Sequence, residues 1–118
     1  MTLDEFITQE SSRWVRNAHV QEPDFNTLYV RWGYHRIGND KGVAQCFDIA
    51  NIEAKHPGKG AFKNLVKRIH KMLPPKIPIY VECVMTEHFV QGLLRMGFRR
   101  LDSELPSDFV LDRGDINQ

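Results

Sequence analysis

Residues 49–66 of this 118-residue chain read IANIEAKHPGKGAFKNLV. The stretch begins as an apolar, strand-like run and ends as the start of an amphipathic helix. Gly58 and Gly60 lie in the turn between the two, where glycine permits positive φ and lets backbone N–H groups approach a ligand. Because the first turn of a helix also carries unpaired N–H donors and the positive end of the helix dipole, the stretch predicts an anion site. A surface turn that is merely rich in Lys and Gly is the alternative interpretation.

Basic residues are concentrated around this turn. Between Ala54 and Val81 the chain has seven Lys or Arg and no Asp or Glu, although the net charge of the whole chain is only +1. The local excess favours a polyanionic ligand such as a nucleotide phosphate, or else forms a solvated helix face. The low net charge and the lack of interleaved aromatic residues argue against a nucleic-acid partner.

Length and composition predict one domain over residues 1–112, with a disordered tail at 113–118. The chain shows no signal peptide and no membrane-spanning run, so we expect a soluble cytoplasmic protein without membrane contact. Cys46 and Cys83 lie in apolar, strand-like runs and are expected to be buried as small hydrophobic residues. The five histidines lack zinc-ligand spacing, so no metal is expected.

Hydrophobic spacing predicts an α/β (α+β) domain with a mixed central sheet. We expect a first helix that is capped by Thr2 or Asp4 and reaches Val15, and a strand over 27–37 with a bulge at Gly33. A hairpin turn over 38–42 leads into an antiparallel strand over 43–53. The other expected elements are a basic amphipathic helix at 61–73, a parallel strand at 77–84, a helix after Thr86 that buries Leu93 and Leu94 and stops at Gly97, and final strands at 98–101 and 109–111.

Two segments of the chain resemble motifs of one enzyme family. PGKGAF at 57–62, followed by Leu65 and Val66, resembles a phosphate-binding loop and the helix behind it. YVECVMTEHFVQGLLRMGF at 80–98 resembles a strand, a helix and a closing Gly-Phe pair. In this order they resemble the GNAT superfamily of acyl-CoA-dependent N-acyltransferases over residues 43–101.

The resemblance implies a GNAT-like domain with helices on both faces of the sheet and acetyl-CoA as the bound cofactor. It implies that the pantetheine arm pairs with main chain beside the turn, and that the pyrophosphate lies on the N–H groups of the loop. The cofactor-binding residues expected on this basis are Asn51, Ile52, Glu53, Gly58, Lys59, Gly60, Ala61, Phe62 and Lys63. The activity it implies is transfer of an acetyl group to a primary amine by direct attack in a ternary complex.

Asp48, Glu82 and Tyr80 are candidates for catalysis, the first two as carboxylates in apolar strands. Asp48 alternates with Cys46, Ala50 and Ile52 along its strand, and a carboxylate among small apolar neighbours is desolvated, as a general base requires. Glu82 is similarly out of place in a β run and could deprotonate or bind the amine. A salt bridge or an exposed strand end is the alternative for Asp48.

The expected proton donor is less clearly marked. The usual tyrosine of the family aligns with Leu93, so Tyr80, water or backbone N–H groups would have to serve the leaving thiolate and the oxyanion. Trp32, Tyr34 and His35 are expected either to line the acceptor side or to pack in the core. A catalytically weak protein that binds CoA and acts as an interaction or inhibitor module is the alternative function. The acceptor, a small molecule or a protein amine, stays open, and an exposed sheet edge favours a homodimer.

Overall fold

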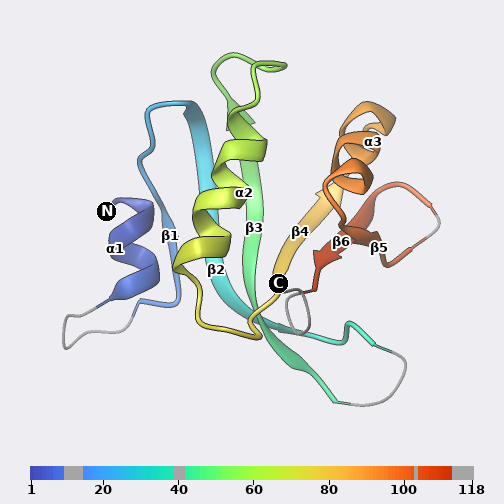
Figure 1. Cartoon of the computed structure of the whole chain (residues 1–118), viewed down its shortest axis with the longest axis horizontal. Coiled ribbons are helices and arrows are strands. Elements are labelled where there is room, and N and C mark those ends of the chain that lie inside the picture. The colour runs from blue at the N-terminus through green and yellow to red at the C-terminus, as the bar shows by residue number, and fades with distance from the viewer. Residues whose placement is uncertain (10–14, 39–41, 103, 113–118) are drawn as a thin grey trace.

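Six strands form one mixed sheet in the order β1-β2-β3-β4-β6-β5 (Figure 1). The computed structural model describes residues 1–9, 15–38, 42–102 and 104–112, so the expected tail at 113–118 and the tip of the hairpin at 39–41 lie outside it. The strands are β1 (Asn17–His19), β2 (Phe25–His35), β3 (Ala44–Ala54), β4 (Ile79–Val84), β5 (Arg99–Arg100) and β6 (Ser107–Leu111). The helices are α1 (Leu3–Thr8), α2 (Ala61–Met72) and α3 (Glu87–Arg95).

The pairing of the strands confirms the predicted mixed α+β sheet. β1, β2 and β3 pair antiparallel, β3 pairs parallel with β4 through the α2 crossover, and β4, β6 and β5 pair antiparallel. The predicted end signals of α3 are also confirmed, because the Thr86 hydroxyl accepts from the Phe89 N–H at 3.3 Å and Gly97 has φ +100°. Among the described residues no helix has both the length and the apolarity needed to cross a membrane.

The first helix is shorter than predicted. Thr2 caps it and forms a capping box with Glu5, as expected, but the helix ends at Thr8 and Gln9 takes φ +30°. The Gln9 side chain then accepts a hydrogen bond from the Val15 N–H at 2.6 Å and donates one to the Val15 carbonyl at 2.7 Å, as the main chain of a paired strand would. Val15 is therefore not helical, and residues 10–14 lie outside the described part of the chain.

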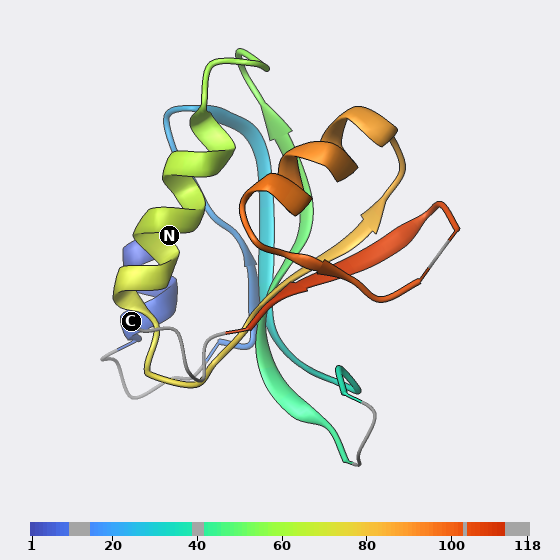
Figure 2. The same ribbon diagram turned by 45° about the vertical axis from the view of Figure 1, so that its right-hand side comes forward.

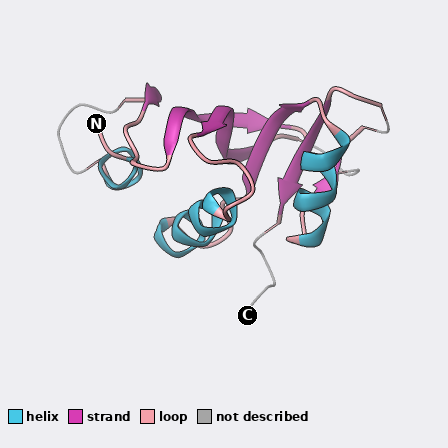
Figure 3. Ribbon diagram, turned by 90° about the horizontal axis from the view of Figure 1, so that it is seen from above, coloured by secondary structure: helices cyan, strands magenta, loops and turns pink. Residues whose placement is uncertain are grey.

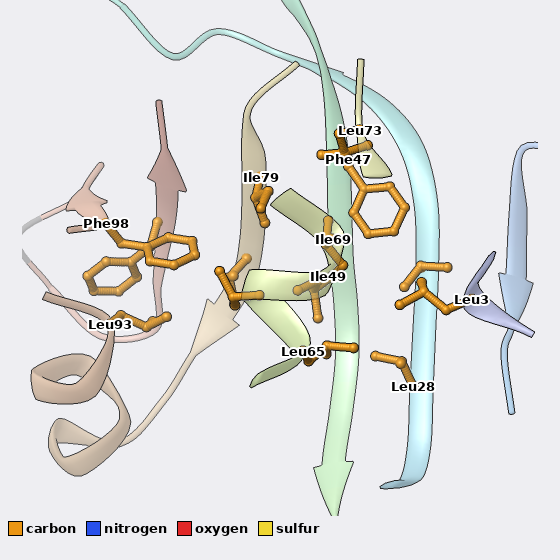
Figure 4. Close-up of a cluster of buried hydrophobic side chains, with 14 of the residues drawn as sticks. Leu3, Leu28, Phe47, Ile49, Leu65, Ile69, Leu73, Ile79, Leu93 and Phe98 are labelled. Carbon is orange, nitrogen blue, oxygen red and sulfur yellow. The ribbon is translucent and has the colours of Figure 1, made fainter. Parts of the chain in front are cut away.

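All three described helices lie on one face of the sheet, so the expectation of helices on both faces is wrong (Figure 3). α1, α2 and α3 all contribute to a single hydrophobic core that also includes alternate residues of β2, β3, β4 and β6. Figure 4 shows Leu65 and Ile69 of α2 over Ile49 of β3. The other face carries a small cluster of Cys46, Tyr80 and Val110 and a set of polar side chains.

A bulge in β3 changes which side chains face the helices. Tyr29 pairs with Asn51 and Val30 with Ile49, so Ala50 is left without a partner in β2. Simple alternation predicts that Ile52 lies on the same face as Asp48. Beyond the bulge, however, Ile52 packs against the helix-side core. The expectation of a bulge at Gly33 is wrong, because Gly33 pairs in register with Cys46.

Candidate functional site

β3 and β4 separate after a short parallel contact. Only Phe47, Asp48 and Ile49 pair with β4, opposite the residues from Ile79 to Val81. Both strands continue beyond this contact and diverge, so that β4 and β6 turn away from β3 (Figure 2). The main chain of β3 beyond Ile49 therefore has no partner in β4 and presents free peptide groups to the gap.

α2 begins at the glycine turn, with its N-terminus toward this gap. Gly58 has φ +86° and Gly60 has φ +83°, which confirms the positive φ predicted for both. Gly60 is the N-cap of α2, no side chain caps the helix, and its first turn holds no acidic residue. A Cβ added at either glycine would meet nothing within 4 Å. The first-turn N–H groups are thus available to an anion, which is the arrangement predicted from the sequence.

An open groove of about 1260 Å³ extends from this helix terminus between α2 and α3. Of the nine predicted cofactor-binding residues, seven line it: Ile52, Glu53, Gly58, Gly60, Ala61, Phe62 and Lys63. Asn51 does not, and Lys59 lines a smaller hollow next to the groove, which shares His56 and Ala61 with it. Lys67, Lys71 and Arg95 add positive charge to the groove, against the single carboxylate of Glu53. Its shape and charge suit an elongated, partly apolar anion.

Two aromatic rings join the helices across the groove. The rings of Phe62 in α2 and Phe89 in α3 meet edge to face, with centroids 5.0 Å apart and planes at 82°. The side chain of Phe62, as well as its backbone, forms part of the groove wall. The contact fixes the separation of the two helices that form the groove.

Asp48 lies on the opposite face of the sheet and is completely buried. Its Oδ2 accepts from Arg31 Nε at 2.9 Å and lies at hydrogen-bond distance, 2.8 Å, from His35 Nε2. Its Oδ1 has no hydrogen-bond partner within the described residues. Burial raises the pKa of Asp48 above its ordinary value, and the bonds from His35 and Arg31 oppose that rise.

His35 is held from two directions. Asp48 binds its Nε2, and its ring lies flat on the Tyr80 ring, with centroids 3.6 Å apart and planes at 5°. The Tyr80 hydroxyl in turn donates to Asp108 Oδ2 at 2.5 Å, and burial together with this carboxylate raises the pKa of Tyr80. The two histidine contacts fix both the position and the plane of the imidazole.

Asp48, Arg31, His35, Tyr80 and Glu82 form a polar cluster on this face, and Glu82 is its accessible carboxylate. Its side chain is 21% exposed, whereas that of Asp48 has no exposure. Arg31 forms an ion pair with Glu82 through Nη2 while its Nε binds Asp48. His35, Asp48 and Glu82 can each offer one atom within 4.8 Å of the others, a spacing that a metal ion could bridge. Because the Arg31 guanidinium already binds both carboxylates, the cluster is better suited to an ion-pair network than to a metal.

The three predicted catalytic residues, Asp48, Glu82 and Tyr80, lie in one cluster. Their neighbours in it, however, were not predicted. Arg31 and His35 come from the neighbouring strand, and only the β2 and β3 register brings them to Asp48, so the sequence does not link these residues. Trp32 packs in the helix-side core against Phe6, and Tyr34 is 55% exposed, so of the three aromatic candidates only His35 joins the cluster.

Four further residues were expected to be buried, and only two of them are. Leu93 is fully buried in the core, as predicted, and its neighbour Gly92 lines the groove. Leu94 was expected to be buried and is 41% exposed. Cys46 is buried as predicted, but Cys83 is exposed, because β4 has an irregular register there and Cys83 takes φ +55°.

Comparison with models of protein families, with curated proteins and with solved structures finds no match to this chain.

Proposed function

We propose that the protein is an acyl-CoA-dependent N-acyltransferase of the GNAT type that transfers an acetyl group from acetyl-CoA to a primary amine. The observation that carries the proposal is the gap between β3 and β4, which opens onto a cationic groove at the uncapped start of α2. The gap supplies free main chain for an amide-rich chain such as pantetheine, and the helix terminus supplies N–H donors for a pyrophosphate.

The residues of the groove fit this ligand. The open space at Gly58 and Gly60 admits phosphate oxygens close to the backbone, and Lys63 adds a positive charge in the first turn of α2. Lys67 and Lys71 follow along the groove, and neither forms an ion pair with a carboxylate of the described residues. Acetyl-CoA supplies the acetyl group as an activated thioester.

The polar cluster on the other face of the sheet supports an acceptor site there. Glu82 comes from the strand that leaves β3 at the gap, and its partly exposed carboxylate can accept hydrogen bonds from a neutral amine and orient it. Asp48 has no exposed surface, so it can act on the acceptor only through Arg31 and His35. Tyr80 holds the ring of His35, and its hydroxyl is engaged by Asp108, so we assign it a positioning role.

Calorimetric titration with acetyl-CoA, with free CoA and ADP as controls, tests the cofactor site. Release of free thiol against spermidine, an aminoglycoside and a lysine-containing peptide then tests transfer. We expect acetyl-CoA to bind and at least one amine to release thiol. Absence of any acetyl-CoA binding by the folded protein would refute the proposal.

A matched pair of variants tests the position of the phosphates. Gly60→Asp and Gly60→Asn place side chains of the same size at the same positive φ, so they share the same backbone cost. Only the aspartate adds a negative charge to the start of α2. We expect Gly60→Asp to bind acetyl-CoA much more weakly than Gly60→Asn, and equal affinities would place the phosphates elsewhere.

A CoA-binding protein without efficient transfer is the second candidate. It is favoured by the leucine at position 93, which has no proton to donate, and by the engagement of the Tyr80 hydroxyl with Asp108, because neither residue can then protonate a leaving thiolate. This candidate predicts acetyl-CoA binding without thiol release for every amine tested.

A further inference from the structure

Transfer to an amine requires a group that accepts a proton from nitrogen, and the polar cluster offers four side chains that could do so. Asp48 has no exposure and cannot contact a substrate. Tyr80 is 5% exposed and donates its hydroxyl to Asp108. Glu82 is accessible, but its carboxylate is already engaged by the Arg31 guanidinium and is better placed to bind the amine. The fourth side chain is that of His35.

His35 has the features of an oriented base. Its side chain is 19% exposed, and Asp48 binds Nε2, which leaves Nδ1 without a hydrogen-bond partner in the described part of the chain. A carboxylate at Nε2 favours the tautomer in which Nε2 carries the proton and Nδ1 carries the lone pair. The Tyr80 ring prevents the imidazole from tilting. One ring nitrogen of His35 and one oxygen each of Asp48 and Glu82 lie within 4.8 Å of one another, so Glu82 lies near the imidazole.

We propose that His35 is the general base of the transfer and that Asp48 positions it, an inference that rests on the proposed function. The amine nitrogen forms a bond to the thioester carbonyl carbon, and the C–S bond breaks with its electron pair going to sulfur. The proton lost by nitrogen passes to His35 Nδ1 and from there to the sulfur, so that the products are the amide and free CoA thiol. Glu82 binds the amine, and Asp48 stabilises the imidazolium while it exists.

Three substitutions separate the functions of the His35 side chain. His35→Gln keeps an N–H donor for Asp48 but cannot accept a proton, and His35→Phe keeps a flat ring on Tyr80. Both are expected to bind acetyl-CoA with unchanged affinity and to lose turnover by about 100-fold or more. His35→Ala leaves a space beside Tyr80, and added imidazole is expected to restore part of its thiol release. Glu82→Gln is the control, because imidazole cannot replace a missing carboxylate.

A spectroscopic measurement tests the same assignment without turnover. Long-range ¹H–¹⁵N spectra of the full chain are expected to show His35 as the Nε2–H tautomer in the wild type and to show loss of this preference in Asp48→Asn. An Nδ1–H tautomer in the wild type would overturn the proposal. So would thiol release by His35→Gln at the wild-type rate, or failure of imidazole to rescue His35→Ala.

The two proposals fail in different ways. A wild-type protein that binds acetyl-CoA but releases no thiol with any amine of the panel refutes the transferase and the general base together. A wild-type protein that releases thiol, beside a His35→Gln variant that does so equally well, refutes only the assignment of His35.

Discussion

Gly33 lies directly against the carboxylate of Asp48 across the β2 and β3 pairing. A Cβ at position 33 would come within 2.2 Å of Asp48 Oδ2 and 3.0 Å of His35 Nε2. Oδ2 is the atom that binds both Arg31 and His35, so it cannot move without loosening both bonds. Gly33 is therefore required here for space and not for a special backbone conformation.

Gly33→Ala is expected to destabilise the fold by about 1–3 kcal/mol, because the added methyl group overpacks a buried and hydrogen-bonded carboxylate. Urea unfolding measures the change. Gly92→Ala is the matched control: its Cβ would meet nothing within 4 Å, and in the middle of α3 alanine is expected to raise stability by about 0.5–1 kcal/mol. A Gly33→Ala variant as stable as the wild type would contradict the close approach.

The elements that the sequence predicted well carry their own local signals. The glycine turn, the apolar spacing of α2 and the Thr86 cap each specify a boundary within a few residues of chain. The bulge at Ala50 has no such signal, since alanine neither requires nor favours it. It arises from the register between β2 and β3, and for this reason the face occupied by Ile52 was predicted wrongly.

The two cysteines are expected to differ sharply in reactivity. Burial, reinforced by the charges of Asp48 and Asp112, raises the pKa of Cys46 to about 12, so its thiol stays protonated and shielded at neutral pH. Cys83 is exposed on β4. A thiol reagent such as Ellman's reagent should therefore titrate one thiol rapidly in the native protein and two in urea. Rapid reaction of two thiols in the native state would show that Cys46 is accessible.

The aromatic contact across the groove is expected to couple the stabilities of α2 and α3. In a double-mutant cycle, Phe62→Leu and Phe89→Leu should show a coupling energy of about 0.5–1.5 kcal/mol, the usual value for an edge-to-face pair. Urea unfolding of the two single variants and the double variant gives this energy. Strictly additive effects would mean that the rings do not contact each other in solution.

The polar cluster could be predicted only in part. Asp48 and Glu82 stand out in the sequence because carboxylates are rare in apolar strands. The roles of Arg31 and His35 depend on strand register, and the fixed hydroxyl of Tyr80 depends on Asp108, which is 28 residues further along the chain. Long-range pairing of this kind leaves no local trace in a single sequence. The exposure of Cys83 has the same origin, since its N–H is bound by Asp108 at a distortion of β4.

The raised pKa of Asp48 predicts how stability changes with pH. Burial raises this pKa from its ordinary value of 3.8, so the folded protein holds the proton more tightly than the unfolded chain does. The contribution of Asp48 to stability is therefore most favourable below that value and is lost as the pH rises through the folded pKa.

Asp48→Asn removes this titration while keeping an amide oxygen for Arg31. The stability of Asp48→Asn relative to the wild type should accordingly increase as the pH is raised from about 4 to 7, when both are unfolded by urea at each pH. Asp102→Asn, which removes an exposed carboxylate, corrects for the general change in net charge. A relative stability that moved the opposite way would mean that Arg31 and His35 outweigh burial and lower the pKa of Asp48 in the folded protein.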